Sequence, residues 1–569
     1  MHLRVKQCTF VYRLSLPVDA IFTCWNIRKR LLFCREGMVP PIMRIRWFSF
    51  ILLLSSLFVA EAQTINAASC NAPDVQTALN SVAADGTTVN IPAGTCVWTT
   101  SVNYTQTYST TIQGQSSIAG TCAPGGSCTA TDSTRIQDNI NHGSVTDYAL
   151  QIATAPNKSF RLTGISFTGY SRQTTDCYNG CIRILGNNAN TGGSQSIRID
   201  HNHLSAYPSG LSLLTFDGWL YGVTDHNLFD TSTNYVYFVR WSGGYWNGVN
   251  DLDRGHASWT DGPHYGTSKF MYLENNTFNG TTGGPSFAYD CYLGGRLAFR
   301  YNQAGIGVTL QTHGLAPGVY RGCRAEEVYN NSFTYTNSPS TSSFAFLLMM
   351  ESGSGMFWGN TTTGFVSNWY ADTIRTSNSS YSYVAPPNGW GYCGTAQTGV
   401  ASAWDHNTNA TGYACIDQVG RGTGHLLTGA AFPDVLDSVT GTITSPNQVS
   451  EPVYAWNNTF NAPSGYSPHY WNNGTLVTVE NRDYYLQLPN YDESAIFDGT
   501  AGIGRGVLSS RPTTCTPYVA YWGTDTNTLY QCSSQNTWTT YYQPYTYPHP
   551  LDTSSGGLPT PTNLVATVN

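Results

Sequence analysis

The apolar residues of this chain recur in short blocks in which apolar and polar positions alternate. A period of two is typical of a β-strand that buries one face. Seven such blocks end at an asparagine or run through one: SIRIDHNHL, GVTDHNLF, YLENNTF, LAFRYNQA, EVYNNSF, MFWGNTT and YAWNNTF. We therefore predict short strands, each followed by a turn that carries asparagine.

The spacing of these asparagines predicts a stack of coils. The first six aligned positions are Asn202, Asn227, Asn276, Asn302, Asn331 and Asn360. Their steps are 25, 49, 26, 29 and 29 residues. A step of this size suits a solenoid coil of three short strands, with the asparagine amides stacked from coil to coil. The step of 49 is either two coils or one coil with a long loop.

A stacked coil exposes its first strand, so a cap is expected at the N-terminal end. The segment APDVQTALNSVAA supplies one, because Val75, Leu79 and Val82 lie on one face of a helix. The first predicted strand, TTVNIPAG, follows directly.

Together with DVQTALNSVAADGTTVNIPAGTC, TTIQGQ and LTGISFTGY, the asparagine blocks resemble right-handed parallel β-helix proteins of the pectin lyase-like superfamily. The resemblance covers roughly residues 68–500 and implies an all-β solenoid with an N-terminal helical cap. The superfamily includes pectate lyases, other polysaccharide lyases, polygalacturonases, phage tailspikes and adhesins, so the fold does not name a reaction.

The chain begins with a segment that we exclude from the fold. A basic n-region after Met43, the apolar run FSFILLLSSLFVA and Ala60-Glu61-Ala62 predict a signal peptide over 43–62. We interpret 1–42 as an extension produced by a start codon assigned too early; the alternative is a long cytoplasmic extension with a signal anchor. The β-helix domain is then 63–505, followed by a small Tyr/Trp-rich module (506–554) and a linker or the start of a further domain (555–569).

Composition supports export. Without residues 1–62, the chain has 18 basic and 31 acidic residues, a net charge near −13 that argues against nucleic acid or an anionic membrane as partner. Twelve cysteines remain, which suits an oxidising extracellular or periplasmic compartment. Neighbour pairing predicts the disulfides 70/96, 122/128, 177/181, 291/323, 393/415 and 515/532. We expect a secreted monomer.

Ionisable residues of this charge-poor chain fall at similar offsets from the turn asparagines. Residues at equal offsets stack about 4.8 Å apart in a parallel β-helix. This rule places Asp217, Arg240, Asp290 and His313 on one strand of successive coils. A second column contains Arg296, Arg324 and Glu351.

These columns predict an enzyme that cleaves an acidic, uronate-containing polysaccharide by β-elimination. Arg296 and Arg324 would clamp the uronate carboxylate, because a guanidinium binds carboxylates with two hydrogen bonds. His313 would be the general base and Asp290 its orienting acid.

Further residues are predicted to contact the substrate. Arg240 and Arg321 would serve as subsite contacts, and Tyr289 or Tyr320 would protonate the leaving oxygen. The long segment between Asn227 and Asn276 is rich in aromatic residues that stack on sugar rings. These residues are Trp241, Tyr245, Trp246, Trp259 and Tyr265.

Two other functions stay open. Polygalacturonases carry carboxylates, a His-Gly and an Arg-x-Lys in the order seen here in WTDG (Asp261), YDCY, THG and RGCR. This chain has a single aspartate at 290 and no lysine after the arginine, although Asp261 and Asp290 could supply a hydrolase's carboxyl pair. A non-catalytic glycan-binding or structural solenoid would also contain buried charge networks.

Buried charges are expected in two more places. Of Glu326 and Glu327, which alternate faces, one is predicted to be an inward or inter-coil partner of an arginine. Asp200, Asp225 and Glu274 precede the turns and stack, so a cation must separate them: either Arg300 or a Ca²⁺ ion.

Overall fold

We describe a computed structural model of the chain. It describes residues 63–142, 148–169, 181–186, 194–205, 212–218, 220–232, 236–242, 258–259, 261–282, 285–314, 322–335, 346–371, 419–424, 448–467, 470–473, 478–487 and 496–552. The predicted extension (1–42), signal peptide (43–62) and linker (555–569) lie outside these residues. None of the helices in the described part combines the length and apolar character needed to cross a membrane.

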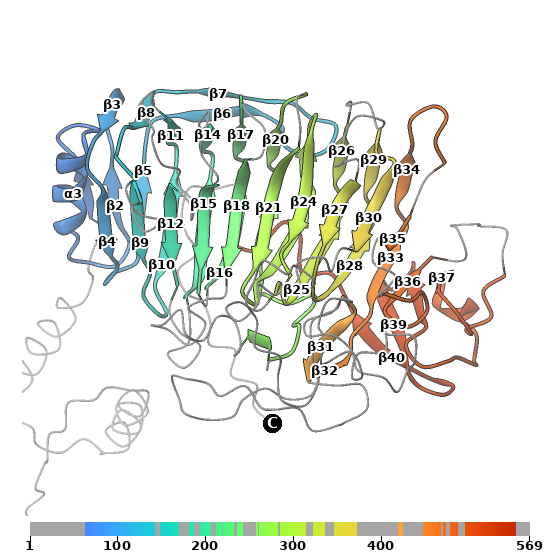
Figure 1. Ribbon diagram of the computed structural model, residues 1–569. Coiled ribbons are helices and arrows are strands. Elements are labelled where there is room, and N and C mark those ends of the chain that lie inside the picture. The colour runs from blue at the N-terminus through green and yellow to red at the C-terminus, as the bar shows by residue number, and fades with distance from the viewer. Residues whose placement is uncertain are drawn as a thin grey trace, which may run out of the picture. The chain divides into compact units, whose positions relative to one another are not determined.

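The chain folds into a right-handed parallel β-helix, as predicted (Figure 1). Each coil contributes one strand to each of three parallel sheets. Sheet A consists of β1 (Thr64–Asn66), β2 (Thr87–Asn90), β5 (Thr110–Gln113), β10 (Ser159–Thr163), β13 (Ser194–Asp200), β16 (Leu220–Asp225), β19 (Met271–Glu274), β22 (Arg296–Arg300), β25 (Ala325–Tyr329), β28 (Ser354–Trp358), β33 (Val453–Trp456) and β36 (Tyr484–Leu486).

Sheets B and C complete the coils. Sheet B consists of β3 (Gly94–Trp98), β8 (Thr134–Asp138), β11 (Ser166–Gly169), β14 (His203–Ser205), β17 (Leu228–Asp230), β20 (Thr277–Asn279), β23 (Gln303–Ala304), β26 (Ser332–Thr334), β29 (Thr361–Thr363) and β34 (Thr459–Asn461). Sheet C consists of β4 (Val102–Thr105), β9 (Leu150–Ala153), β12 (Ile182–Leu185), β15 (Ser212–Asp217), β18 (Tyr237–Ser242), β21 (Ser286–Tyr292), β24 (Val308–Thr312), β27 (Phe346–Met350), β30 (Ser367–Ala371) and β35 (Asn472–Asn473).

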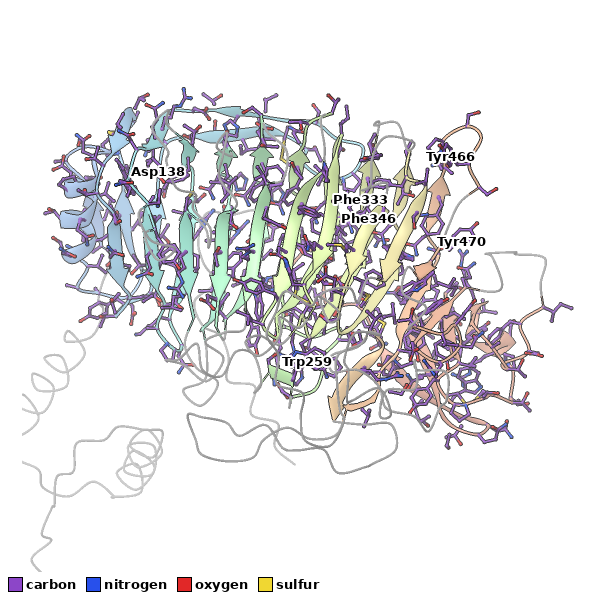
Figure 2. The ribbon with its side chains drawn as sticks, viewed as in Figure 1. Asp138, Trp259, Phe333, Phe346, Tyr466 and Tyr470 are labelled. Carbon is purple, nitrogen blue, oxygen red and sulfur yellow. A yellow bond between two sulfur atoms is a disulfide. The ribbon has the colours of Figure 1, made fainter. Side chains whose placement is uncertain are left out.

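Apolar side chains from the three sheets fill the inside of the coils. Phe229 and Phe278, on neighbouring strands of sheet B, stack with ring centroids 4.6 Å apart. Phe299 and Phe333 continue this interior cluster (Figure 2). Identical strand periods therefore place similar side chains above one another, which gives one continuous core.

The turn between sheets A and B carries a buried asparagine ladder. In each coil from Asn202 to Asn360, the backbone N–H and the side-chain amide both donate to Oδ1 of the next asparagine; for Asn302 and Asn331 these distances are 2.8 and 3.2 Å. Asn458 ends the series after Asn360. Because Asp225 pairs directly with Glu274, the step of 49 residues is one coil with a long loop.

The N-terminal end is covered by α3 (Ala72–Asn80), which buries Val75 and Leu79 against the core cluster. The disulfide Cys70–Cys96 joins the segment before this helix to β3. A hairpin of β6 (Ser117–Gly120) and β7 (Cys128–Thr131), closed by Cys122–Cys128, extends along sheet B (Figure 1). It contacts that sheet where Thr277 donates to Cys122 O at 3.1 Å.

The C-terminal module forms a separate sheet at the other end of the stack. Its strands are β37 (Ile503–Gly506), β38 (Ala520–Gly523), β39 (Thr528–Ser534) and β40 (Thr537–Tyr542), with a 3-10 turn at η4 (Leu508–Ser510). A further pair, β31 (Arg421–Gly424) and β32 (Gln448–Ser450), is antiparallel. Trp522 packs against Trp358 and Trp456, so the module shares a core with sheet A.

Four of the predicted disulfides are confirmed: Cys70–Cys96, Cys122–Cys128, Cys291–Cys323 and Cys515–Cys532. The predicted pairs 177/181 and 393/415 include residues outside the described part of the chain.

The acidic column of sheet A is confirmed, and arginines balance it. Asp200, Asp225 and Glu274 follow one another in register, and Arg300 is the next residue of the column. Arg300 binds Glu274 (Nε to Oε2, 2.6 Å), as predicted for the cation. Arg161 binds Asp200 and Arg198 binds Asp225, each through two hydrogen bonds.

Residues 543–552, which we call the strap, cross the outward face of sheet A after β40. Arg300 donates to Tyr545 O and Thr546 O, both at 2.8 Å. His549 N donates to Glu274 at 2.7 Å. Arg198 then binds Leu551 O and the carboxylate of Asp552, at 2.8 and 2.7 Å. The end of the described chain is thus fixed to coils more than 350 positions earlier in the sequence.

We expect Asn302→Ala to destabilise the whole β-helix. The substitution leaves the buried Asn276 N–H and Leu273 C=O without their partners, which commonly costs about 1–3 kcal/mol each. Asn279→Ala is the matched control, because this exposed amide binds the Asp230 side chain at the surface. Urea unfolding measures both, and equal stability of the two variants would contradict the ladder's role.

We expect Arg300→Ala to release the strap. The change leaves Glu274 buried without its cation and removes two hydrogen bonds to the strap, a loss of about 3–5 kcal/mol. Limited proteolysis followed by mass spectrometry should then show cleavage within 543–552. Arg161→Ala breaks a similar pair on β10, before the coils that the strap crosses, and should leave these residues protected.

Candidate functional site

The outward face of sheet C carries a column of polar residues in direct register. Arg183, Thr215, Arg240, Asp290 and Gln311 pair in succession from β12 to β24. Their sequence neighbours Phe216, Trp241 and Cys291 belong to the interior cluster, so these five side chains point away from the core. The predicted neighbourhood of Arg240 and Asp290 is therefore present.

His313, Asp290 and Arg240 are in contact. Asp290 Oδ2 accepts a hydrogen bond from Arg240 Nε at 2.9 Å, and its Oδ1 accepts from His313 Nδ1. Burial of the Asp290 carboxyl opposes its ionisation, but the charges of His313 and Arg240 outweigh it and hold the pKa of Asp290 below its usual range. Asp290 is thus an ionised carboxylate that orients the imidazole.

The other ring nitrogen of His313 points toward Gln311. Gln311 Nε2 lies 3.4 Å from His313 Nε2. If Nδ1 donates to Asp290, Nε2 carries the lone pair, which is the tautomer that a general base requires. The His313 side chain retains 13% of its exposure, and Tyr237 and Tyr292 lie at 6.5 and 6.1 Å between ring centroids. The site can therefore accept a proton beside two aromatic rings.

Asp217 occupies a different column from the one predicted. It pairs in register with Ser242, two residues beyond Arg240. Its carboxylate binds Arg183 on the preceding coil, and this arginine lies over the ring of Tyr148 at 4.9 Å. Asp217 and Arg183 therefore form a second charge pair on the same face, two coils from Asp290.

Arg296 and Arg324 do not form an accessible clamp. Both are completely buried: Arg296 lies on β22, and Arg324 immediately precedes β25, where Ala325 is the register partner of Arg296. Arg296 donates to Ser258 O and Gly262 O, at 2.8 and 2.7 Å, and burial lowers its pKa to about 10. Arg324 binds Glu451 at 2.7 Å. Their guanidinium groups are occupied by the protein itself, so the predicted contact with a uronate carboxylate is not supported.

Several predicted substrate contacts lie inside the protein. Trp241 and Tyr289 belong to the interior cluster and have no exposed surface. Trp259 is 2% exposed and donates to Gly322 O at 2.9 Å (Figure 2). These three rings cannot stack on a sugar in this arrangement. The predicted contacts Arg321, Tyr245, Trp246 and Tyr320 lie outside the described residues. Tyr265 is hydrogen-bonded to Ser354 Oγ at 2.7 Å and packs against Tyr542.

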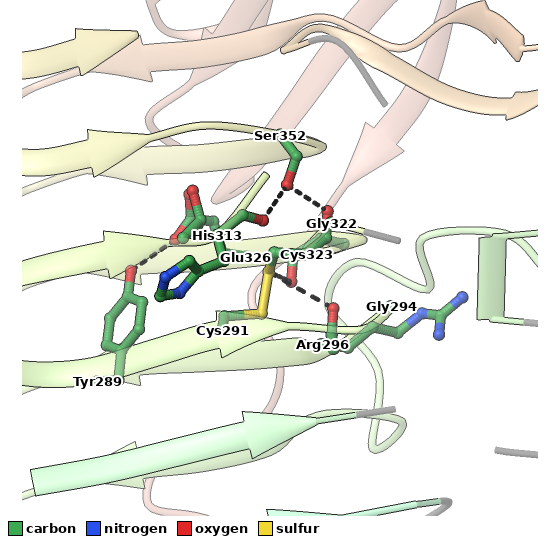
Figure 3. Close-up of a disulfide and its surroundings, with 12 residues drawn as sticks. Tyr289, Cys291, Gly294, Arg296, His313, Gly322, Cys323, Glu326 and Ser352 are labelled. Atoms are coloured by element: carbon green, nitrogen blue, oxygen red, sulfur yellow. Dashed lines mark hydrogen bonds between the residues drawn. A yellow bond between two sulfur atoms is a disulfide. The ribbon is translucent and has the colours of Figure 1, made fainter. Parts of the chain in front are cut away.

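The partners of Glu326 and Glu327, on β25 of sheet A, also differ from prediction. Glu326 points inward, where its partner is the hydroxyl of Tyr289 and not an arginine (Figure 3). Burial raises the pKa of Glu326 to about 8, so it is protonated at neutral pH. Glu327 points outward and accepts from Gly266 N and Tyr542 OH at 2.7 and 2.9 Å. Both carboxyls tie neighbouring segments together.

The carboxyl pair of a hydrolase is not assembled. Asp261 lies in the segment that covers sheet A and binds His264 at 2.7 Å. Burial opposes its ionisation, but His264 and Arg296 lower the pKa of Asp261 to about 2. Asp290 lies on sheet C with both oxygens engaged. Neither group is placed as the protonated acid that such a mechanism needs.

The predicted calcium position contains a guanidinium. Among the described residues, Asp225, His226 and Asp552 could bring ligand atoms within 4.8 Å of one another. Arg198 Nη2 already contacts both of these carboxylates, at 2.6 and 2.7 Å. We therefore do not place Ca²⁺ in this column.

Sequence reasoning missed Gln311, Tyr237 and Tyr292. Gln311 precedes His313 by two positions, and a period of two puts both side chains on the same face of the strand. The sequence alone could therefore have predicted this contact. The tyrosines are neighbours of Arg240, which lies over both rings at 5.0 and 5.2 Å. No distinct motif marks them in a chain with 37 tyrosines.

A second histidine cluster lies on sheet B. His203 Nδ1 contacts Asp132 at 2.9 Å and Ser205 lies 3.2 Å from Nε2, which resembles a Ser-His-Asp arrangement. However, Asp230 also binds Nε2, at 2.8 Å. Burial lowers the pKa of His203, but hydrogen bonds to Asp230 and Asp132 outweigh it and raise the pKa. Because both ring nitrogens are bound to carboxylates, neither is free to deprotonate the serine, so the cluster is a structural tie.

Comparisons with known proteins provide no family. No family model and no curated protein matches this sequence. A solved structure named "Geobacillus virus E2 - ORF18" is similar at a TM-score of 0.23 and 10% sequence identity. The match covers 59% of this chain and 61% of that protein, so the chain spans less than two thirds of its length. A likeness this weak carries no argument about function.

We expect the His203 tie to stabilise the fold only at acidic to neutral pH. Because the folded pKa of His203 is raised, its contribution is complete below the unfolded value of about 6.5 and is lost as pH rises through the folded pKa. His203→Gln should therefore cost about 1 kcal/mol in mildly acidic buffer and less in alkaline buffer, as measured by urea unfolding. Asn279→Ala, which removes the neutral amide bound to the same Asp230, is the control and should cost the same in both buffers.

Proposed function

We propose that this protein is a secreted enzyme of the pectin lyase-like superfamily that cleaves an acidic polysaccharide by β-elimination. The observation that carries the proposal is the group formed by His313, Asp290 and Arg240 on the outward face of sheet C. The four disulfides and the parallel β-helix fit an extracellular member of that superfamily.

His313 Nε2 would remove the proton at C5 of the uronate ring. The bond between C4 and the glycosidic oxygen then breaks, a C4–C5 double bond forms, and the leaving oxygen takes a proton from solvent water, because the hydroxyl of Tyr289 donates to Glu326 inside the coil. Asp290 stabilises the imidazolium that results, through Nδ1. Arg240 keeps Asp290 ionised and fixed, because it binds the other carboxylate oxygen.

The substrate carboxylate would lie along the same column. Arg183 and Arg240 are separated by Thr215 alone, so their backbones are about 10 Å apart at about 4.8 Å per coil. Both guanidinium groups already bind a carboxylate of the protein, Arg183 that of Asp217 and Arg240 that of Asp290, so a uronate carboxylate would have to share these arginines with their present partners. Arg321 stays a proposed subsite contact from the sequence.

A hydrolase or a non-catalytic glycan-binding solenoid would have to use other features. The hydrolase needs two available carboxyl groups, and Asp261 and Asp290 are both committed to internal partners. A structural solenoid would need no partly exposed histidine bound to a buried carboxylate on its outward face. Both alternatives are outcomes of the following experiment.

We expect His313→Gln and Asp290→Asn to lower turnover of a polyuronate by about 10²–10⁴-fold, because each removes part of the general base. The measurement is the ultraviolet absorbance of the unsaturated product, followed with a panel of polyuronates and neutral glycans. His226→Asn is the matched control, since it removes an imidazole bound to Asp225 on sheet A.

Other results would point elsewhere. Full activity of both site variants would move the active site away from His313. New reducing ends without the unsaturated product would indicate a hydrolase, and Asp261→Asn would then be the damaging change. Binding without cleavage would leave a glycan-binding protein.

A further inference from the structure

The main chain of His313 is held from three sides. Its N–H donates to Cys291 O at 2.7 Å. Its carbonyl oxygen accepts from Cys323 N at 3.0 Å and from Ser352 Oγ at 2.7 Å (Figure 3). These contacts come from three successive coils, so the backbone that carries the imidazole cannot shift without breaking bonds in each of them.

The two cysteines in this frame are joined to each other. Cys291 and Cys323 form a buried disulfide at the corner between sheets C and A. Cys291 directly follows Asp290, the partner of the imidazole. The cross-link therefore connects the strand that carries Asp290 to the segment that fixes the carbonyl of His313.

The segments around the His313 backbone are closely packed at Gly322 and Gly295. A methyl group at Gly322 would lie 2.3 Å from Ser352 Oγ, and one at Gly295 would lie 2.8 Å from Cys291 Sγ and 2.4 Å from the Trp241 ring. Ser352 Oγ also bonds Cys323 O at 3.2 Å. Trp241, inside the coil, and Cys291 Sγ therefore both lie close to the backbone of Gly295.

We infer that the Cys291–Cys323 disulfide and Ser352 are positioning residues that set the His313 imidazole against Asp290. The catalytic part of this inference rests on the proposed function. The hydrogen bond between Nδ1 and the carboxylate depends on the two backbones staying in place, and a displacement near 1 Å can cost about 10²-fold in rate. The disulfide and Ser352 act only through His313.

The test uses the full chain with two kinds of variant. Cys291→Ala/Cys323→Ala removes the cross-link, and Ser352→Ala removes the hydroxyl alone. Cys515→Ala/Cys532→Ala is the matched disulfide control in the C-terminal module. Ser367→Ala is the matched hydroxyl control, because Ser367 Oγ bonds Trp369 O on β30.

The first measurement does not depend on catalysis. The Nδ1 proton of a histidine bonded to a carboxylate gives a far-downfield proton resonance in NMR spectra, which His313→Gln assigns by its loss. We expect this resonance to weaken or move in the cross-link variant and in Ser352→Ala. Both controls should keep the resonance of the parent protein, although removing either disulfide lowers stability.

The second measurement separates positioning from stability. On a polyuronate that the parent protein cleaves, the two positioning variants should lose about 10–100-fold in kcat with little change in KM, and their pH profiles should shift. An unchanged resonance in both positioning variants would overturn the inference. If the cross-link variant does not fold, the resonance of Ser352→Ala decides alone. If His313→Gln keeps full activity, the proposed function fails, while the resonance still tests the positioning.

Discussion

One buried amide in each coil sets the geometry of the whole molecule. The asparagine side chain satisfies the backbone N–H of its neighbour in the stack and, through its own NH₂, a carbonyl of a sheet A strand. A shift of one residue would leave these buried groups without partners, so the ladder fixes the register of the coils from Asn202 to Asn458. The residue before the asparagine takes up a positive φ from His201 to Asn457, which turns the chain in the same way each time.

The candidate site follows from this register. Arg240 and Asp290 are 50 positions apart in sequence and lie side by side because their coils are locked together. His313 then completes the group from the end of the next strand. A charge-poor chain can keep these groups buried because each one has a partner of opposite charge, and an unpaired charge would be costly at the same depth.

Counting from the asparagines predicted the stack, the acidic column and the place of Asp290 beside His313, whereas Arg240 was expected to contact substrate and instead binds Asp290. The errors have two physical causes. Trp241 and Tyr289 adjoin Arg240 and Asp290 in the sequence, and these two charged side chains point outward, so the period of two places both rings inside the coil and not against a substrate. Arg296 on β22 and Arg324 just before β25 are covered by other segments of the chain, and offsets within a coil do not reveal which segments these are. Their partners are backbone carbonyls of Ser258, Asp261 and Gly262 and the carboxylate of Glu451.

The strap also constrains how this protein could change its length. A solenoid gains or loses coils easily in principle, because each coil contacts only its neighbours. Here the tail has fixed attachment points at Glu327, Arg300, Glu274 and Arg198, which lie on different coils. A duplicated or deleted coil between β13 and β25 would move these points by about 4.8 Å relative to a tail of unchanged length. The attachment points therefore constrain the number of coils between β13 and β25. Evolutionary change in coil number is easier outside this span than within it.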